Sequence, residues 1–395
     1  MVLALVNWIS AMGFKLPHLF WYVSFRMVAC AMTSMLLTVL FGRVFITGLA
    51  RLKIGHKMRV GNVAVLAAGY KKSEEIPSMG GLLFISTILV SALYWIDLTH
   101  VFSWILIFSM LWLGFLGALD DYSKIRGLKK GVSPRKKMFF QLILGSLLSA
   151  YLFIPSVAKS IPLKPPKVKE HIEQTTHVMK ELSVKEYATH YYIPFIKQPI
   201  VVTGVGIIGC FLLSLIVISG TANAVNLSDG LDGLASGLVM LPAVVLAMVA
   251  FLSNHIGLAS YLNIIYIEGA SEIAVFLSAL SGALLGFLWY NAFPAEVFMG
   301  DTGSLALGGI LGVAAILLRR EFLLALIGGV FVIETLSVMI QVMSFRYRGG
   351  KRVFLCAPIH HHFQMKGWHE SKVVIRFWML GLLFALLGIA SLKFQ

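Results

Sequence analysis

The sequence predicts an all-α, polytopic integral membrane protein with about ten transmembrane helices. Three observations support this class. Of the 395 residues, 58% are hydrophobic and only 13% are charged, and the mean hydropathy of +0.86 lies outside the range of soluble globular domains. The apolar residues gather in runs of roughly 20, the length that crosses a bilayer as a helix. Basic residues collect in three of the loops between these runs, as cytoplasmic loops do.

Ten apolar runs are the candidate spans. They lie at residues 20–48, 79–97, 102–119, 138–156, 200–221, 234–253, 273–290, 303–318, 322–345 and 374–392. No internal repeat at a fixed period connects them, which weakens an interpretation as an inverted-repeat transporter. We therefore expect a single integral membrane domain over residues 1–395.

The basic loops predict the orientation. Segments 49–78, 120–137 and 346–376 carry six, seven and seven Lys/Arg, and all three fall on one side of a ten-span arrangement. The short loops on the other side carry few, with Arg319 and Arg320 as the exception. The basic side should be cytoplasmic, including a histidine-containing loop at 346–373, and both termini should be extracytoplasmic.

The long segment 157–199 lies between the fourth and fifth predicted spans. It carries seven lysines, but long loops count weakly in the orientation rule, so we expect an extracytoplasmic insertion. Pro162, Pro165 and Pro166 favour extended chain at its start, and its sparse alternation permits a small hairpin. The N-terminus lacks a basic region followed by a small-residue cleavage site, so we expect no removable signal.

Net charge and cysteine spacing do not call for a nucleic-acid partner, a disulfide framework or a zinc site. The formal charge of +15 is explained by loops beside anionic lipid, and we expect no nucleic-acid partner. Cys30, Cys210 and Cys356 are widely spaced, which offers neither a disulfide framework nor a zinc spacing.

The aspartates predict a functional site. Five of the six fall at predicted cytoplasmic helix ends, namely Asp120, Asp121, Asp229, Asp232 and Asp301, while Asp97 lies elsewhere. For any one of them alone, a solvated helix end is the better explanation. Five on the side of the basic loops favour a shared site, because carboxylates near hydrocarbon need water, a partner or a metal.

Two of the acidic clusters have a clear physical sense. Adjacent Asp120 and Asp121 repel each other, and a divalent cation relieves that repulsion. Asn226, Asp229 and Asp232 are spaced by three residues, so in helical geometry they share a face suited to a polar ligand. Gly230 lets the backbone approach closely there, although it is equally consistent with an ordinary loop.

The third cluster centres on Asp301, which precedes the predicted eighth span. Its carboxylate could cap that helix, bind a metal, or do both, since it has two oxygens. Oxygen-only ligands near phosphate chemistry favour Mg²⁺ over zinc.

A histidine-rich loop, APIHHHFQMKGWHE at 357–370, contains His360, His361, His362 and His369. Three consecutive histidines diverge along the backbone and do not easily converge on one metal. Together with the arginines and lysine at 346–352, they suit a nucleotide diphosphate. A basic juxtamembrane loop that binds lipid headgroups is the alternative.

The motifs, in order, resemble those of the polyprenyl-phosphate phosphosugar transferases. They are PSMGG (77–81), GALDDYSK (117–124), NAVNLSDGLDG (223–233), FMGDTGS (298–304) and PIHHHF (358–363). Within that family, the histidine triplet resembles the corresponding motif of the phospho-N-acetylmuramoyl-pentapeptide transferases. The resemblance implies transfer of phospho-MurNAc-pentapeptide from UDP-MurNAc-pentapeptide to undecaprenyl phosphate, giving lipid I and UMP in peptidoglycan synthesis, with Mg²⁺ as cofactor. It also implies a bacterial cytoplasmic (inner) membrane location, a cytoplasmic active site and a homodimer.

The resemblance implies a role for each matching position. Asp301 resembles the magnesium ligand. The catalytic set is completed by Asp120 and Asp121, beside the metal and the lipid phosphate, and by His361. The implied substrate-binding positions are Asn226, Asp229 and Asp232 at the nucleoside end, Phe298 stacked on uracil, and Asn291, Gln341, His360 and His362 in the pocket.

One departure concerns the first motif. The family usually has a lysine four residues before the motif's proline, but Ser73 stands there and Lys72 lies one residue earlier. Ser78 also replaces the usual threonine. We assign substrate binding to Lys72 through an altered loop.

We expect direct attack by the lipid phosphate, with Asp120 as an orienting group or optional base, rather than a covalent enzyme intermediate. Glu334, in the middle of the ninth run, is expected to be a buried structural residue bonded to neighbouring helices. Three alternatives are open: a UDP-GlcNAc phosphotransferase, which should lack the histidine triplet; an ion-coupled transporter, which would place aspartates near the bilayer midplane; and a non-catalytic lipid-binding protein.

Overall fold

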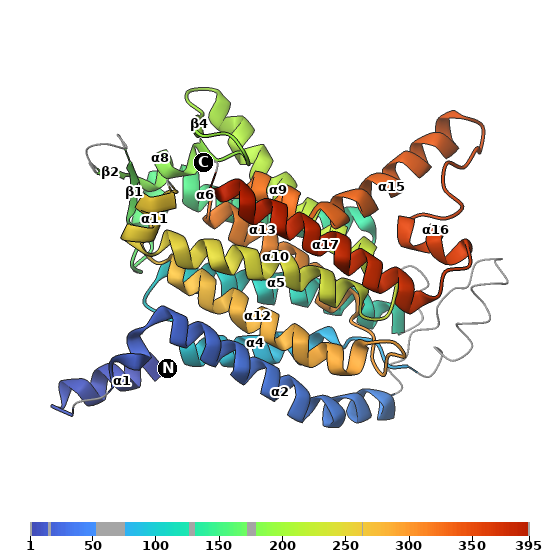
Figure 1. Cartoon of the computed structure of the whole chain (residues 1–395), viewed down its shortest axis with the longest axis horizontal. Coiled ribbons are helices and arrows are strands. Elements are labelled where there is room, and N and C mark those ends of the chain that lie inside the picture. Colours follow the sequence, from blue (N-terminus) through green and yellow to red (C-terminus); the bar gives the residue numbers. More distant parts are fainter. Residues whose placement is uncertain are drawn as a thin grey trace.

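The protein is described from a computed structural model, which covers residues 2–14, 17–52, 76–125, 131–171, 179–262 and 264–393. It is a bundle of long, roughly parallel helices (Figure 1). The long helices are α2 (Val23–Arg51), α4 (Gly81–Trp95), α5 (Val101–Ile125), α6 (Pro134–Phe153), α9 (Gly206–Ser228), α10 (Leu234–Ser253), α12 (Ala270–Asn291), α13 (Gly300–Leu317), α15 (Gly329–Tyr347) and α17 (Glu370–Leu392). The short ones are α1 (Val2–Ala11), η1 (His18–Trp21), α7 (Pro155–Ser160), α8 (Val184–Ala188), α11 (Ile256–Leu262), α14 (Glu321–Ile327) and α16 (Ile359–Met365).

The helices confirm the all-α, polytopic membrane class. Eight of them in the described part of the chain are long and apolar enough to cross a membrane. The other two predicted spans correspond to α4, which is apolar but has 15 residues, and to α6, whose first turn is basic. Each of the ten apolar runs thus contains helix, while the count of ten crossings stays a prediction.

The ninth predicted span is interrupted. The run 322–345 forms two helices, α14 and α15, that meet at Gly328 and Gly329. A Cβ on Gly329 would lie 2.8 Å from the ring of Phe384 in α17, so close helix packing requires glycine there. The break lets α15 leave the bundle at an angle (Figure 1).

The fifth predicted span begins later than expected. The run 200–221 supplies strand β4 (Ile200–Val201) first, and α9 starts only at Gly206. Gly204, with φ +59°, separates the two elements. Apolar composition alone does not distinguish the strand from the helix, because both are rich in valine and isoleucine.

Helices α12 and α13 form the centre of the bundle. Nearly all of their residues are buried, 19 of 22 in α12 and 16 of 18 in α13. Helix α12 packs against α2 and α10, whereas α13 packs against α5 and α9. Small residues permit these contacts: a Cβ on Gly308 would lie 2.3 Å from the carbonyl oxygen of Thr221, and one on Gly282 would lie 2.1 Å from that of Ala31. This packing fixes α13, whose first turn carries Asp301.

A small α/β subdomain lies at one end of the bundle, between α6 and α9. Strands β1 (Val168–His171) and β2 (Met179–Leu182) pair antiparallel, which confirms the predicted hairpin, and β1 also pairs with β5 (Tyr266–Ile267). Strand β3 (His190–Tyr191) pairs antiparallel with β4. The Tyr187 hydroxyl donates to the Leu317 carbonyl at the end of α13, which ties the subdomain to the bundle.

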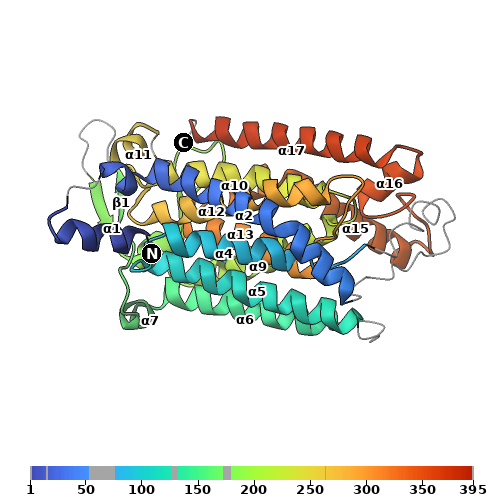
Figure 2. The same cartoon turned by 90° about the horizontal axis from the view of Figure 1, so that it is seen from below.

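The two ends of the bundle differ in content. Helix α1 and the last turns of α17 lie toward the end that carries β1 and α11, whereas α16 lies at the opposite end (Figures 1 and 2). An even number of crossings places both termini at one end in this way. Which end faces the cytoplasm stays a prediction from the basic loops.

Candidate active site

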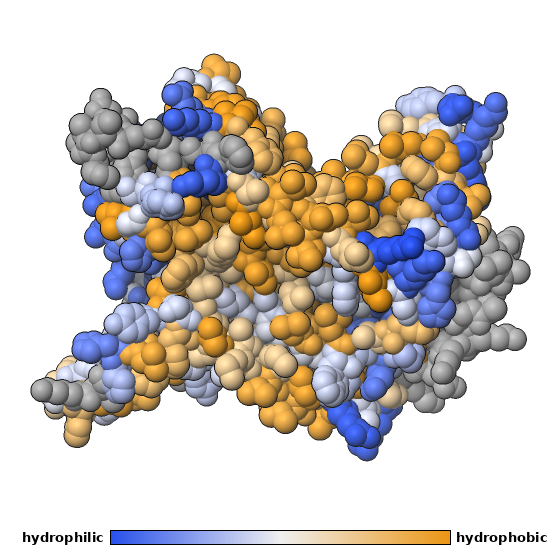
Figure 3. Space-filling model, in the orientation of Figure 1, coloured by the Kyte–Doolittle hydropathy of each residue, from blue (hydrophilic) through white to orange (hydrophobic). Residues whose placement is uncertain are grey.

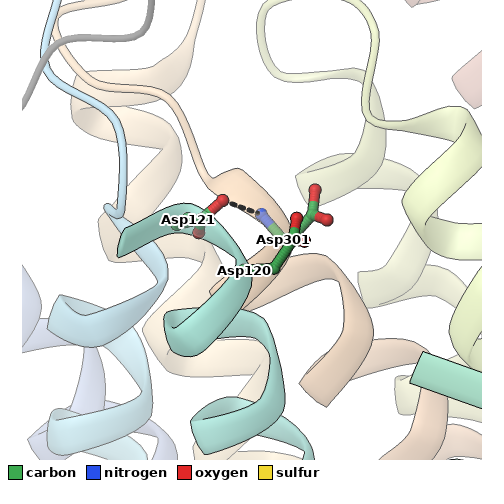
Figure 4. Close-up of side chains that lie close together, drawn as sticks. All are labelled: Asp120, Asp121 and Asp301. Atoms are coloured by element: carbon green, nitrogen blue, oxygen red, sulfur yellow. Dashed lines mark hydrogen bonds between the residues drawn. The ribbon is translucent and has the colours of Figure 1, made fainter. Parts of the chain in front are cut away.

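Three carboxylates meet where α5 ends and α13 begins. Asp120 and Asp121 come from the last turns of α5, and Asp301 comes from the first turn of α13. One oxygen of each lies within 4.8 Å of the others, and among the described residues this is the group that could hold a metal ion. Figure 4 shows Asp121 turned toward the α13 backbone, with Asp120 and Asp301 side by side.

Asp121 caps α13. Its Oδ1 accepts from the Asp301 backbone N–H at 3.1 Å, and its Oδ2 accepts from the backbone N–H and the hydroxyl of Thr302 at 2.9 and 2.6 Å. These bonds satisfy donors that the first helical turn leaves without partners. Gly300, with φ +74°, lets the chain approach, since a Cβ there would lie 2.6 Å from Asp121 Oδ2. The sequence allowed Asp301 to cap its own helix, but Asp121 supplies the cap from α5.

Asp301 is therefore available to the site, where two lysines bridge it to Asp120. Lys124 Nζ lies 2.6 Å from Asp120 Oδ2 and 3.1 Å from Asp301 Oδ2. Lys137 Nζ, from the first turn of α6, lies 2.9 and 2.5 Å from the same two oxygens. Asp120 is fully buried, whereas Lys124, Lys137 and Asp301 keep 26%, 18% and 17% of their side-chain surface exposed. The two carboxylates thus face a position that cations already share.

Sequence reasoning missed both lysines, because basic residues beside a membrane span are explained by orientation alone. For Lys124 a signal existed, since it follows Asp120 by four residues on the same helix. For Lys137 none did. It lies 164 residues from Asp301 and adjoins Lys136, which is exposed.

The NAVNLSDGLDG motif reaches the carboxylates through Asn226. Its Nδ2 donates to Asp301 Oδ1 at 3.0 Å and to the Ser304 hydroxyl at 2.8 Å. The structure thereby places Asn226 beside Asp301, together with Ser304, which sequence reasoning did not select. Asn226 thus bonds Oδ1 of Asp301, whereas the two lysines contact Oδ2 of the same carboxylate.

Asp229 and Asp232 lie beyond α9, which ends at Ser228, so the helical face expected for Asn226, Asp229 and Asp232 is wrong. Desolvation raises the pKa of Asp229 to about 8, and the carboxylates of Asp301 and Asp121 add to the shift. Asp232 Oδ2 accepts from the Ala295 backbone N–H at 2.9 Å, and its own N–H donates to Glu370 Oε1 at 2.9 Å. Asp232 therefore ties the motif to the loop before Phe298, while Asp229 stays near the carboxylate cluster.

The histidine helix α16 packs against this motif. His360 is fully buried, and its Nδ1 lies 3.1 Å from Glu334 Oε2 on α15, which is equally buried. A Cβ on Gly230 would lie 2.4 Å from His360 Nε2 and 3.2 Å from His361 Nε2, so only glycine fits between the two segments. The expected burial of Glu334 is confirmed, and its partner is a histidine of the predicted site.

The three histidines point to different partners. His361 Nδ1 bonds Gln364 Oε1 at 2.7 Å, and His362 Nδ1 accepts from the Leu355 backbone N–H at 3.1 Å. Desolvation, and to a smaller extent His360, lowers the pKa of His361 to about 4, so its imidazole is neutral at neutral pH. In the protein without substrate, His361 is therefore a neutral hydrogen-bonding group.

Phe298 and Asn291 belong to the FMGDTGS side of the site. The Phe298 N–H donates to Pro77 O at 2.9 Å and its carbonyl accepts from Gly80 N–H at 2.8 Å, which joins the PSMGG motif to the start of α13. Asn291 is buried, with both ends of its amide bonded, to the Ser236 hydroxyl and to the Val297 carbonyl. Through these buried hydrogen bonds, Asn291 stabilises the loop that precedes Phe298.

Gln341 lies farther along, on α15. Its Nε2 donates to Phe354 O, and its Oε1 accepts from the N–H groups of Val353 and Phe354, all at 2.9 to 3.0 Å. With Arg346 and Arg352 it lines a cavity of about 410 Å³ between α15 and the loop before α16. Lys72, the remaining predicted site residue, lies outside the described residues.

Comparison with known proteins defines the class. A helical membrane protein with three converging carboxylates at helix ends fits a membrane-embedded transferase of phosphosugars. The family model of glycosyl transferase family 4 matches residues 103–319, more than half of the chain, from the third residue of α5 to just past the end of α13.

Curated relatives narrow the class. A phospho-N-acetylmuramoyl-pentapeptide-transferase of Protochlamydia amoebophila is 51% identical over 96% of this chain and 96% of its own length. Relatives with the same name from Methylacidiphilum infernorum and Thermodesulfovibrio yellowstonii are 42% and 40% identical, again over 96% of both chains. The chain belongs to the phospho-N-acetylmuramoyl-pentapeptide transferases of glycosyl transferase family 4. The expected resemblance is confirmed, and the relatives' names favour a transferase over the transporter and lipid-binding alternatives.

Proposed function

We propose that the protein transfers phospho-MurNAc-pentapeptide from UDP-MurNAc-pentapeptide to undecaprenyl phosphate, forming lipid I and UMP in peptidoglycan synthesis. The relatives' shared name supports the muramoyl substrate. The observation that carries the proposal is the meeting of Asp120 and Asp301 around two lysines, beside motifs that occur far apart in the chain. Such a constellation suits a reaction between two phosphate-bearing substrates.

The donor set fits Mg²⁺. Asp120 and Asp301 offer hard oxygen ligands that already share cations, and Asn226 orients the Asp301 carboxylate. Mg²⁺ is commonly held by one or two carboxylates together with substrate phosphates. We propose Asp301 as its principal ligand, with Asp120 beside it. When bound, the ion supplies charge neutralisation for the diphosphate.

The chain's own residues account for the rest of the reaction. Lys124 and Lys137 are placed to neutralise the phosphates of donor and acceptor, and Asp121 keeps the start of α13 in position. Neutral His361 offers a hydrogen bond. A phosphate monoester has a second pKa near ~6, so the acceptor is largely dianionic at neutral pH and needs alignment more than a base. Its oxygen attacks the β-phosphate directly, the bond from that phosphorus to the UMP oxygen breaks, and Asp120 orients the nucleophile.

The same proposal includes location and assembly. Described lysines of the basic segment 120–137, Lys124 and Lys137, lie at the end of the bundle that carries the aspartates, which supports an active site on the cytoplasmic face of the bacterial inner membrane. The homodimer implied by the resemblance is proposed with it.

The first test measures UMP release by purified protein with undecaprenyl phosphate and Mg²⁺. UDP-MurNAc-pentapeptide is compared with UDP-GlcNAc, with and without a chelator. We expect release with the muramoyl donor alone, and loss of release on chelation. Activity with UDP-GlcNAc alone would contradict the donor, and no release with either donor from folded protein would contradict the whole proposal.

A second test addresses direct attack. The protein is incubated with donor labelled in the β-phosphate, without acceptor lipid, and then denatured. We expect no label on the chain, and a stable phosphosugar adduct on any aspartate would overturn the one-step reaction.

A further inference from the structure

The β3–β4 hairpin presents an unusually apolar surface at the end of the bundle away from the aspartates. Among residues 193–209, Lys197 is the sole charged residue. Six large apolar side chains in and just after the hairpin are exposed, with exposed fractions from 47% to 83%: Phe195, Ile196, Ile200, Val201, Val205 and Ile208. Figure 3 shows apolar surface over the region where Figure 1 places β4 and the start of α9.

The hairpin is fixed on its inner side, so its exposure does not result from a loose attachment. Strand β3 pairs His190 with Val201 and Tyr191 with Ile200, and the Val202 N–H donates to Thr189 O at 3.0 Å. The Tyr191 ring lies under the Arg319 guanidinium, 4.6 Å from its centroid. The exposed side chains of Ile200 and Val201 are therefore carried on a fixed backbone.

The exposed surface continues along α9. Ile208, Leu212 and Ile216 are exposed at a spacing of four residues, which places them on one face of a helix that is long and apolar enough to span the membrane. Val205, the residue just before α9, extends this exposed apolar surface toward the hairpin. No charged residue lies between this exposed face of α9 and Ile200 and Val201 of β4.

We propose that the β3–β4 hairpin is a membrane-interface anchor, whose outer side chains enter the headgroup and acyl boundary of the leaflet at its end of the bundle. Lipid is the favoured occupant because the surface is aliphatic, continues a lipid-facing helix and carries a single lysine suited to a lipid phosphate. Through β3 and Arg319, the anchor also fixes the far end of α13. The inference does not depend on the transfer reaction.

The test uses full-length protein in vesicles of phosphatidylcholine and phosphatidylglycerol, with one environment-sensitive fluorophore. Cys30 and Cys210 are buried, so a Cys356→Ser background leaves one reactive thiol when Ile196→Cys or Ile200→Cys is added. Lys185→Cys, exposed on α8 of the same subdomain, is the water-facing control, and Leu212→Cys on α9 is the lipid-facing control. Quenching is measured with brominated lipids and with aqueous iodide.

For insertion to a depth of about 5 to 10 Å, we expect lipid quenching at 196 and 200 at least about threefold stronger than at 185, and approaching that at 212. Iodide should quench position 185 alone. Iodide access at 196 and 200 equal to that at 185 would overturn the anchor, because the surface would then face water. Protection from both quenchers would overturn it too, since a second copy or another protein would then cover the hairpin. The two sites are independent, so misfolding of one variant leaves the other decisive.

Discussion

Charged residues lie near both ends of α13, but they are partly exposed at its start and fully buried just past its end. At its start, Asp301 and its lysine partners keep between 17% and 26% of their side-chain surface exposed. Just past its end, Arg319 and Arg320 are fully buried, with their guanidinium groups over the rings of Tyr191 and Tyr192 at 4.6 and 4.7 Å. Arg319 also pairs with buried Glu321 at 2.9 Å.

This difference in exposure distinguishes a region that can bind a ligand from a region that stabilises the fold. Charges that retain access to solvent can exchange partners with a ligand, whereas charges enclosed by aromatic rings are committed to the fold. The end of α13 near Arg319 therefore stabilises the contact between the α/β subdomain and the bundle. The end at Asp301 remains accessible to a substrate. Burial inside the protein also explains why Arg319 and Arg320 can lie at the end predicted to be extracytoplasmic.

The comparison is sharpened most by Asp301→Asn. We expect UMP release to fall by about 10³-fold or more, because the proposed ion loses its principal charged ligand, while the unfolding temperature changes little. Asp97→Asn is the matched control, since Asp97 accepts from Thr99 and lies away from the cluster. Equal losses in both variants would show that the effect is not specific to the site.

Removing charge from the other end should change stability instead. Arg319→Met leaves Glu321 buried without its cation, and we expect the free energy of unfolding to fall by about 3 kcal/mol. Folded protein should keep its turnover. The measurement is chemical unfolding in detergent micelles. The double variant Arg319→Met/Glu321→Leu should lose less, and an equal loss would argue against the pair as the cause.

Gly230→Ala tests whether the histidine helix must touch the aspartate motif. The added methyl group would lie 2.4 Å from buried His360 Nε2, so α16 must shift, and we expect kcat/KM to fall by about 10- to 100-fold. Gly220→Ala on α9 meets nothing within 4 Å and is the control. Unchanged activity in Gly230→Ala would show that the contact does not position the site.

Lys137→Met tests whether the lysines compete with a metal for the carboxylates. Without the ammonium group on Asp301, we expect Mn²⁺ to bind the substrate-free protein several-fold more tightly by electron paramagnetic resonance, while kcat/KM falls about tenfold. Lys136→Met, exposed and adjacent, should change neither. Weaker Mn²⁺ binding in Lys137→Met would contradict the competition.

The smallest effect concerns the subdomain beside the arginine end. The hydrogen bond to Glu170, 3.4 Å away, raises the pKa of His190 above its ordinary 6.5, against the effect of burial. Because the folded-state pKa is the higher one, this stabilisation is complete below about pH 6.5 and is lost as pH rises through the folded value. We expect about 0.5 kcal/mol, absent in Glu170→Gln, from unfolding at pH 6 and 8. An identical pH dependence in both proteins would exclude this pair.

Long apolar runs were the most predictable part of the fold. Each of the ten contains helix, because a run of about 20 apolar residues has few other ways to satisfy its backbone in a bilayer. Boundaries were harder where composition stayed apolar: Ile200 and Val201 form a strand, and Gly328 divides a predicted span. There, neighbouring elements decided the backbone path.

The sequence by itself determined the membrane class, the family and the residues able to hold a metal, because these follow from residue chemistry and local order. Tertiary structure alone decided their partners. It assigned Asp121 to cap α13, brought Lys137 to Asp301, and enclosed Arg319 among tyrosines. Chemically similar residues therefore take different roles, as the adjacent Asp120 and Asp121 do. Burial and distance set the free energy of each charge, and both depend on packing between segments that are remote in the sequence.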